Sequence, residues 1–181
     1  MIYFTADTHF CHSNVIKMCN RPFGNINEMN EILIQNWNAV VGNCDEIYIL
    51  GDFLYKGTGL QANQILQKLN GKKYLIKGNH ERYLSNPDFD EELFEWVNDY
   101  HVLDYKDARF ILFHYPIAEW QFFYRKSAHL YGHVHNNVNN LPENNSTLQM
   151  LDKRTINVGV DVNNFFPVSA EEVYDKAFGG K

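Results

Sequence analysis

The sequence predicts an α/β protein in which a largely parallel sheet is followed by a second, mixed or antiparallel sheet. In the first half, short apolar runs alternate with segments whose apolar residues recur at helical spacing, and three of these runs end at polar residues. In the second half, several short apolar runs follow one another closely. Alternating strands and helices are typical of parallel sheets, whereas closely spaced strands are typical of mixed or antiparallel sheets.

The chain opens with an expected strand over residues 2–6. A short helix over residues 15–19 should follow, with Ser13 or Asn14 as its N-terminal cap. This helix must end before Pro22, because proline cannot continue a helix.

The next four elements complete the alternation. Apolar residues at helical spacing predict a helix over residues 27–41, which Gly42 closes. A strand over residues 46–50, a helix over residues 59–69 and a strand over residues 73–76 follow.

The second half predicts a different arrangement of elements. We expect a helix over 91–97, strands over 102–105, 109–113, 127–131 and 155–162, and a last helix opened by the capping box of Ser169 and Glu172. The Asn-rich residues 136–145 include Pro142 and predict a surface loop. Since no repeat or break in composition divides the chain, residues 1–181 are expected to form a single domain.

The charge balance argues against broad nucleic-acid binding. The 181 residues include 16 Lys and Arg against 22 Asp and Glu, which gives a net charge of −6 with the eight histidines neutral. General nucleic-acid binders carry the opposite charge. The odd count of three cysteines, the absence of a signal-peptide pattern and the absence of a long apolar run predict a cytoplasmic protein without a membrane partner.

Polar side chains gather at the ends of the expected strands. Carboxyl ends of parallel strands meet at one edge of a sheet, where ligands bind. The set combines imidazoles, carboxylates and an amide, which together suit first-row divalent transition metals. Its members are Asp7, His9, Asp52, Asn79, His80, His114, His133 and His135.

These residues form a series that resembles the calcineurin-like metallophosphoesterase family. The series runs from Asp7 to His135 and consists of Asp-x-His, Gly-Asp, Gly-Asn-His-Glu, a single His, and Gly-His-x-His, in that order. The resemblance implies a four-layer α/β/β/α sandwich with two central mixed sheets and a dinuclear metal centre. It also implies hydrolysis of a phosphate ester by in-line attack of a metal-bridging hydroxide.

The resemblance also implies a division of the ligands between two cations. One cation would be held by Asp7, His9, Asp52 and His135, and the other by Asp52, Asn79, His114 and His133. His80 is left to interact with the phosphate or to protonate the leaving oxygen, or else to orient a ligand. The neutral imidazoles favour manganese first, and iron, zinc or nickel next, over magnesium.

A small bacterial and phage-type subgroup of the family is similar in the segment that follows Asp7. That subgroup often has Gly where this chain has Cys11, which we expect to be a small packed residue. His12 is expected either to contact substrate or to cap the following helix. Arg21 is either a phosphate clamp, because guanidinium binds phosphate bidentately, or a solvated loop residue.

The remaining histidines and aromatic residues have structural interpretations. His101 and His129 fall outside the motifs and are expected to be structural. The aromatic stretch over residues 115–124 is either a wall of the substrate cleft or, in the slightly favoured interpretation, core or a dimer surface. A homodimer therefore remains among the expectations.

Two functions of different class compete. The favoured one is a hydrolase for a small phosphorylated substrate, and the alternative is a non-catalytic interaction module that retains the fold. Retention of His80 beside a full ligand set favours the hydrolase. The few candidate cations for an enclosed monoester pocket, Arg21, Arg125 and Lys126, favour phosphodiesters, including cyclic nucleotides.

Overall fold

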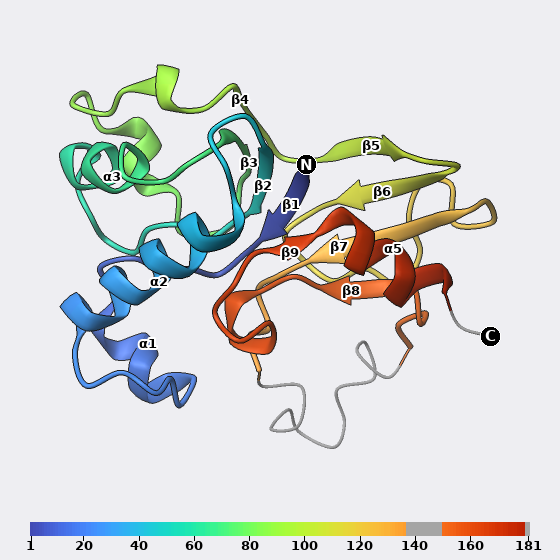
Figure 1. Ribbon diagram of the computed structural model, residues 1–181, viewed down its shortest axis with the longest axis horizontal. Coiled ribbons are helices and arrows are strands. Elements are labelled where there is room, and N and C mark those ends of the chain that lie inside the picture. Colours follow the sequence, from blue (N-terminus) through green and yellow to red (C-terminus); the bar gives the residue numbers. More distant parts are fainter. Residues whose placement is uncertain (137–149, 180–181) are drawn as a thin grey trace.

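A computed structural model describes residues 1–136 and 150–179 and contains two mixed sheets with helices, which confirms the predicted α/β class (Figure 1). In the first sheet, the strand order is β4-β3-β2-β1-β9, and in the second it is β5-β6-β7-β8. The helices are α1 (Ser13–Met18), α2 (Ile26–Val40), α3 (Gly59–Leu66) and α5 (Ala170–Phe178). The strands are β1 (Ile2–Thr5), β2 (Glu46–Leu50), β3 (Lys72–Ile76), β4 (Trp96–Asn98), β5 (His101–Tyr105), β6 (Ala108–Leu112), β7 (Ser127–Tyr131), β8 (Thr155–Asn157) and β9 (Val168–Ser169).

Parallel pairing dominates the first sheet, as the alternation of strands and helices predicts. Strands β1 to β4 pair in parallel, and only β9 runs antiparallel, beside β1. In the second sheet, β5 and β6 form an antiparallel hairpin, while β6, β7 and β8 pair in parallel. The carboxyl ends of β1, β2, β3, β6 and β7 consequently bring the motif-bearing loops together.

Two apolar clusters hold these layers together. One lies between the first sheet and α2 and α3, where Ile47, Ile49 and Leu75 pack with Leu33 and Trp37. The other lies between the sheets and includes Phe4, Leu50, Phe110 and Leu130, with α5 contributing Val173 at the edge where β1, β8 and β9 meet.

The helix ends follow the local sequence in most cases. The expected capping box of Ser169 and Glu172 is present at the start of α5. The side chain of Asn25 caps α2, and Thr58 forms a capping box with Gln61 at the start of α3. The prediction for α1 is wrong, because neither Ser13 nor Asn14 caps it: His12 holds the N-cap position and its side chain makes no capping hydrogen bond.

Two element predictions are wrong for tertiary reasons. The expected helix over residues 91–97 is instead a single 3₁₀ turn, Glu91–Leu93, followed by β4. Pairing with β3 along Tyr74 to Ile76 makes that segment extended, and pairing of this kind overrides local propensity. The expected strand over residues 155–162 ends at Asn157, because the chain turns there to bring Gly159 beside Ala6.

The Asn-rich loop expected over residues 136–145 lies, apart from Asn136, outside the described residues. Within the described part of the chain, no helix is long and apolar enough to cross a membrane.

Packing between the two sheets predicts a large loss of stability on truncation of Phe110. This ring is fully buried and meets Phe4 edge-on at 5.6 Å between centroids, so Phe110→Ala leaves a cavity between the sheets. We expect a loss of about 3–5 kcal/mol in the free energy of unfolding, measured by urea denaturation. Leu60→Ala on the exposed side of α3 is the control, with an expected change within about 0.5 kcal/mol. Equal effects of the two substitutions would contradict the assignment of this core.

Candidate metal centre

Backbone pairing between β1 and β2 continues past the ends of both strands and positions the first two motifs. The N–H of His9 donates to the carbonyl of Asp52 at 2.9 Å, and the N–H of Phe10 donates to the carbonyl of Phe53 at 2.9 Å. The N–H of Asp7 donates to the carbonyl of Gly51 at 3.0 Å. The carboxylates and the imidazole of the two loops therefore have fixed relative positions.

The expected ligands converge in two groups. Asp7, His9 and His135 each offer one donor atom, and these atoms lie within 4.8 Å of one another. Asp52, His114 and His133 form a second group by the same measure.

Asn79 joins the second group. Its amide oxygen lies 3.3 Å from Nε2 of His114 and 3.1 Å from Nδ1 of His133. The Oδ2 atom of Asp52 lies 3.5 Å from Nε2 of His9 and 3.6 Å from Nε2 of His114. This carboxylate oxygen therefore stands between the two groups, where a bridging ligand belongs.

Hydrogen bonds orient the donor atoms. The Oδ1 atom of Asp52 accepts the backbone N–H groups of Asn79 and His80 at 3.0 and 3.1 Å, which leaves Oδ2 for the interior of the site. The Nδ1 atom of His114 lies 2.7 Å from the carbonyl of Leu50. Because a carbonyl can only accept, Nδ1 carries the proton and Nε2 is free to act as a ligand.

The backbone at the site is strained. Five of the seven expected ligands have φ between 49° and 70°, the left-handed region that side chains other than glycine rarely occupy. They are Asp7, His9, Asp52, His133 and His135. Strain of this kind costs about 1–3 kcal/mol per residue and persists where the surrounding structure enforces it. At this site, the left-handed conformation directs the side chains of these five residues toward the centre.

Two motif glycines are required by close approach. A Cβ atom on Gly78 would lie 2.4 Å from Oδ1 of Asp52, and a Cβ atom on Gly132 would lie 2.6 Å from Oδ2 of Asp7. Both distances are shorter than van der Waals contact, so each glycine makes room for a carboxylate.

The donor set fits divalent cations on the evidence of burial. Asp7 and Asp52 are almost fully buried, and burial raises the pKa of Asp7 to about 7. Burial also lowers the pKa of His9 to about 2, so this imidazole is neutral, and neither of its ring nitrogens has a hydrogen-bond partner among the described residues. Buried carboxylates beside an unpartnered neutral imidazole are costly unless a cation accompanies them.

His80 lies beside the two groups without belonging to either. Its Nε2 atom is 3.9 Å from Oδ2 of Asp52, and 31% of its side chain is exposed. The ring of Tyr55 meets it edge-to-face at 4.8 Å between centroids. His80 therefore combines proximity to the centre with access to solvent, as a group that meets a substrate must.

A buried network that the sequence does not reveal supports His135. Its Nδ1 atom lies 2.7 Å from Oδ2 of Asp161, and a ring nitrogen of the same residue belongs to the group with Asp7 and His9. Burial acts to raise the pKa of Asp161, but hydrogen bonds from His135 and Arg21 outweigh it and hold this pKa below its ordinary value. A carboxylate behind a ligating histidine fixes the tautomer and the orientation of the ring.

Both expectations for Arg21 are wrong. Its guanidinium is fully buried and forms a bidentate ion pair with Asp161, with Nε to Oδ1 at 2.7 Å and Nη2 to Oδ2 at 2.8 Å. The remaining N–H groups point to the carbonyls of Asp7 and Thr8 and to the sulfur of Met29. Since no donor is left for a phosphate, Arg21 acts as a support beneath the Asp7 loop.

Glu81 also supports the loops of the site. It is the last residue of the Gly-Asn-His-Glu motif, and the sequence alone suggests no role for it. Its carboxylate accepts the backbone N–H of Phe53 at 3.0 Å and that of Gly78 at 2.7 Å. Burial raises its pKa to about 7. The residue ties the two loops that carry Asp52 and Asn79.

The other histidines and Cys11 occupy distinct environments. His101 and His129 lie away from the two groups, and the ring nitrogens of His129 face the carbonyls of Ile111 and Tyr115, so the structural interpretation is confirmed. Cys11 is half-buried against the core, as expected. The ring of His12 stacks on Tyr55 at 3.7 Å between centroids, close to His9.

Most of the aromatic stretch over residues 115–124 lies away from the ligands. Trp120 is buried behind β7, where its indole N–H donates to Ser127 and its ring faces His129. Tyr115 alone in this stretch contacts the ring of His133, at 4.7 Å between centroids. The interpretation as core therefore holds for Trp120, and Tyr115 is the residue of this stretch whose ring lies beside the expected ligands.

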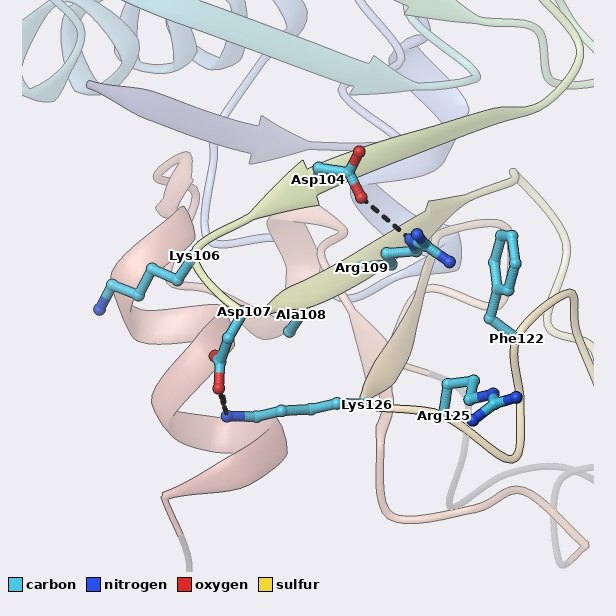
Figure 2. A pocket seen from close by; sticks show the side chains of 8 residues that line it. All are labelled: Asp104, Lys106, Asp107, Ala108, Arg109, Phe122, Arg125 and Lys126. Atoms are coloured by element: carbon cyan, nitrogen blue, oxygen red, sulfur yellow. Dashed lines mark hydrogen bonds and ion pairs between the residues drawn. The ribbon is translucent and has the colours of Figure 1, made fainter.

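Arg125 and Lys126 line a different pocket, of about 530 Å³ (Figure 2). This pocket lies at the start of β6, about 20 Å from the end that leads to His114. Lys126 pairs there with Asp107 at 2.7 Å. Neither of these two candidate cations lies at the metal centre, so neither contributes positive charge to a monoester pocket there.

Comparison with known proteins places this arrangement in a family. A model of the calcineurin-like phosphoesterases matches residues 1–145, and the chain belongs to that family. Members are hydrolases of phosphate esters that bind divalent metals. The resemblance inferred from the sequence is thereby confirmed.

Individual relatives agree with the assignment of the fold. The chain is 37% identical to the uncharacterized protein MJ1445 of Methanocaldococcus jannaschii over 182 residues, which cover 99% of this chain and 93% of that protein. Gene 66 protein of Mycobacterium phage L5 is 32% identical over 81 residues, 44% of this chain and 39% of that one. The crystal structure of the protein of unknown function AQ665 from Aquifex aeolicus superposes with a TM-score of 0.71 at 28% identity, covering 96% of this chain and 97% of that one.

The network behind His135 predicts a loss of metal affinity in Asp161→Asn. An amide can accept from His135 or from Arg21, but its NH₂ group then opposes the other donor. We expect manganese to bind about 10–100-fold more weakly, measured by titration calorimetry. Thermal unfolding of the metal-free variant controls for loss of the fold, and unchanged affinity would contradict the supporting role of Asp161.

Proposed function

We propose that the protein is a phosphodiesterase with a dinuclear metal centre, in which Asp52 bridges two divalent cations. The observation that carries the proposal is the position of Oδ2 of Asp52 between two groups of donors, with His80 beside it. Two cations held there would supply a nucleophile at neutral pH and would neutralise the phosphate. Asp7, His9 and His135 would hold one, and Asn79, His114 and His133 the other.

His80 is proposed as the general acid. Its side chain reaches solvent while its Nε2 atom stays within 3.9 Å of Asp52. A substrate phosphate bound at the centre would therefore place its leaving oxygen beside this ring, which donates a proton as the phosphorus–oxygen bond breaks. Tyr55 limits the rotation of the ring by its edge-to-face contact.

The preference for diesters rests on the charges around the centre. A monoester carries one more negative charge than a diester and needs an enclosing cationic pocket. The three cations considered for that role lie elsewhere: Arg21 is buried against Asp161, and Arg125 and Lys126 line the pocket at the start of β6. A diester carries less negative charge, so two metals would neutralise it without additional cationic side chains.

The metal identity and the cellular setting belong to the same proposal. Imidazole, carboxylate and amide ligands favour manganese, with iron, zinc or nickel as substitutes. Cys11, Cys19 and Cys44 are unpaired, which supports a reducing, cytoplasmic setting. The expected partner is a small phosphorylated substrate.

A substrate panel tests the function directly. We expect the protein, reconstituted with manganese, to hydrolyse bis(p-nitrophenyl) phosphate with higher kcat/KM than p-nitrophenyl phosphate, followed by release of p-nitrophenol. Binding of about two metal equivalents, measured by elemental analysis after reconstitution, is the accompanying readout. Hydrolysis of neither ester with manganese, nickel, zinc or magnesium would instead support the non-catalytic interaction module.

Substitution separates the bridging ligand from the general acid. His80→Ala should retain both metals and lose about 10²–10⁴-fold in kcat on an alkyl diester, because an alkoxide leaving group needs a proton. Asp52→Asn should lose metal and turnover together. Metal content and rate are measured on the same samples, and full activity of His80→Ala on the alkyl diester would refute the general-acid role.

A further inference from the structure

A small polar pocket opens beside the metal centre, on the side where His80 stands. Its volume is about 310 Å³. Eight residues line it: Cys11, His12, Ser13, Asn14, Tyr55, Lys56, Gly57 and Gln61. None of these is a metal ligand, so the pocket is separate from the centre although it adjoins it.

The walls of the pocket are built by the same backbone pairing that positions the ligands. Beyond Asp52 the two loops stay paired, since Phe10 forms a bridge with Leu54 and the N–H of Tyr55 donates to the carbonyl of Phe10 at 3.1 Å. The pocket residues directly follow this paired segment on both loops. Its position relative to the metal centre is therefore fixed by main-chain hydrogen bonds.

Tyr55 forms the wall shared by the pocket and the general acid. One contact of its ring is the edge-to-face approach to His80 at 4.8 Å, and another is the stack on His12 at 3.7 Å. A general acid stands next to the leaving oxygen of its substrate. A group attached to that oxygen and extending past Tyr55 enters the pocket.

The lining selects for a polar, anionic group. Ser13 offers a hydroxyl and Asn14 an amide, and Gln61 uses its carbonyl oxygen for the N–H of Thr58, which leaves its NH₂ group as a donor. Lys56 is the only charged side chain among the described lining residues, and no ion pair involves it within residues 1–136 and 150–179. Its ammonium lies 5.2 Å from the centroid of the Tyr55 ring.

We infer that this pocket binds the leaving group of the substrate, and that the leaving group is a sugar-sized alcohol with a second phosphate, which Lys56 recognises. The inference rests on the proposed phosphodiesterase function. In the reaction, water adds its oxygen to phosphorus, the bond from phosphorus to the leaving oxygen breaks, and His80 supplies the proton for that oxygen. The substrate class is a short nucleotide diester with a further phosphate one sugar beyond the scissile one.

Three dinucleotides test this assignment. Thymidylyl-thymidine is compared with its 5′-phosphorylated and 3′-phosphorylated forms, and cleavage of the internal diester is followed by chromatography with manganese present. We expect one phosphorylated form to show a kcat/KM about tenfold above the unphosphorylated dinucleotide, as one charge-assisted contact supplies. Lys56→Met should abolish this ratio, and Lys56→Arg should retain most of it.

Lys68→Met is the matched control, because Lys68 is an exposed lysine near the end of α3 that does not line the pocket. Its ratio should equal that of the unaltered protein. Equal rates on all three dinucleotides, no cleavage of any of them, or a ratio that survives Lys56→Met would overturn the inference.

Hydrolysis of bis(p-nitrophenyl) phosphate distinguishes a wrong pocket assignment from a wrong proposed function. The leaving group of this ester carries no second phosphate, so its hydrolysis does not depend on the pocket. Hydrolysis of that ester without a dinucleotide preference refutes the pocket assignment alone. Loss of both activities in the unaltered protein refutes the phosphodiesterase as well.

Discussion

The structure depends on keeping two carboxylates, Asp7 and Asp52, buried next to each other. Each raises the cost of the other, because like charges repel and burial removes the water that would screen them. Main-chain N–H groups offset part of this cost: two from the Asn79 loop reach Asp52, and that of His133 reaches Asp7 at 2.9–3.0 Å. The positive charge of His135 offsets a further part at Asp7, and two divalent cations at the centre would offset the remainder.

The supports differ in kind on the two sides of the centre. Beneath Asp7, the ion pair of Arg21 and Asp161 joins the first loop to the 3₁₀ turn that follows β8, and Asp161 holds His135 from behind. Beneath Asp52, Glu81 accepts two main-chain N–H groups and ties neighbouring loops of one sheet. The Arg21–Asp161 ion pair thus joins distant parts of the chain, whereas Glu81 stabilises neighbouring loops at one edge of the first sheet.

The sequence predicts most of what depends on local pattern. The runs that became β2 and β7 were bounded correctly, and the motif residues that meet at the centre could be found because each follows a strand. The helix predicted over residues 91–97 is wrong for the Trp96 segment, since the extended form of this segment comes from pairing with β3. Asp161 belongs to no motif, and its role appears only once the fold brings it into contact with Arg21, 140 positions away in the sequence.

The span of that contact also has a consequence for biosynthesis. A ribosome releases the chain from the N-terminus, so Asp7 and His9 emerge long before His135, and Asp161 follows later still. Until then the carboxylates at the end of the first sheet lack the contacts that His135 and Asp161 provide in the folded protein. Metal loading of a centre that includes His135 would therefore come late in synthesis. Contacts of such long range also form slowly compared with the helices.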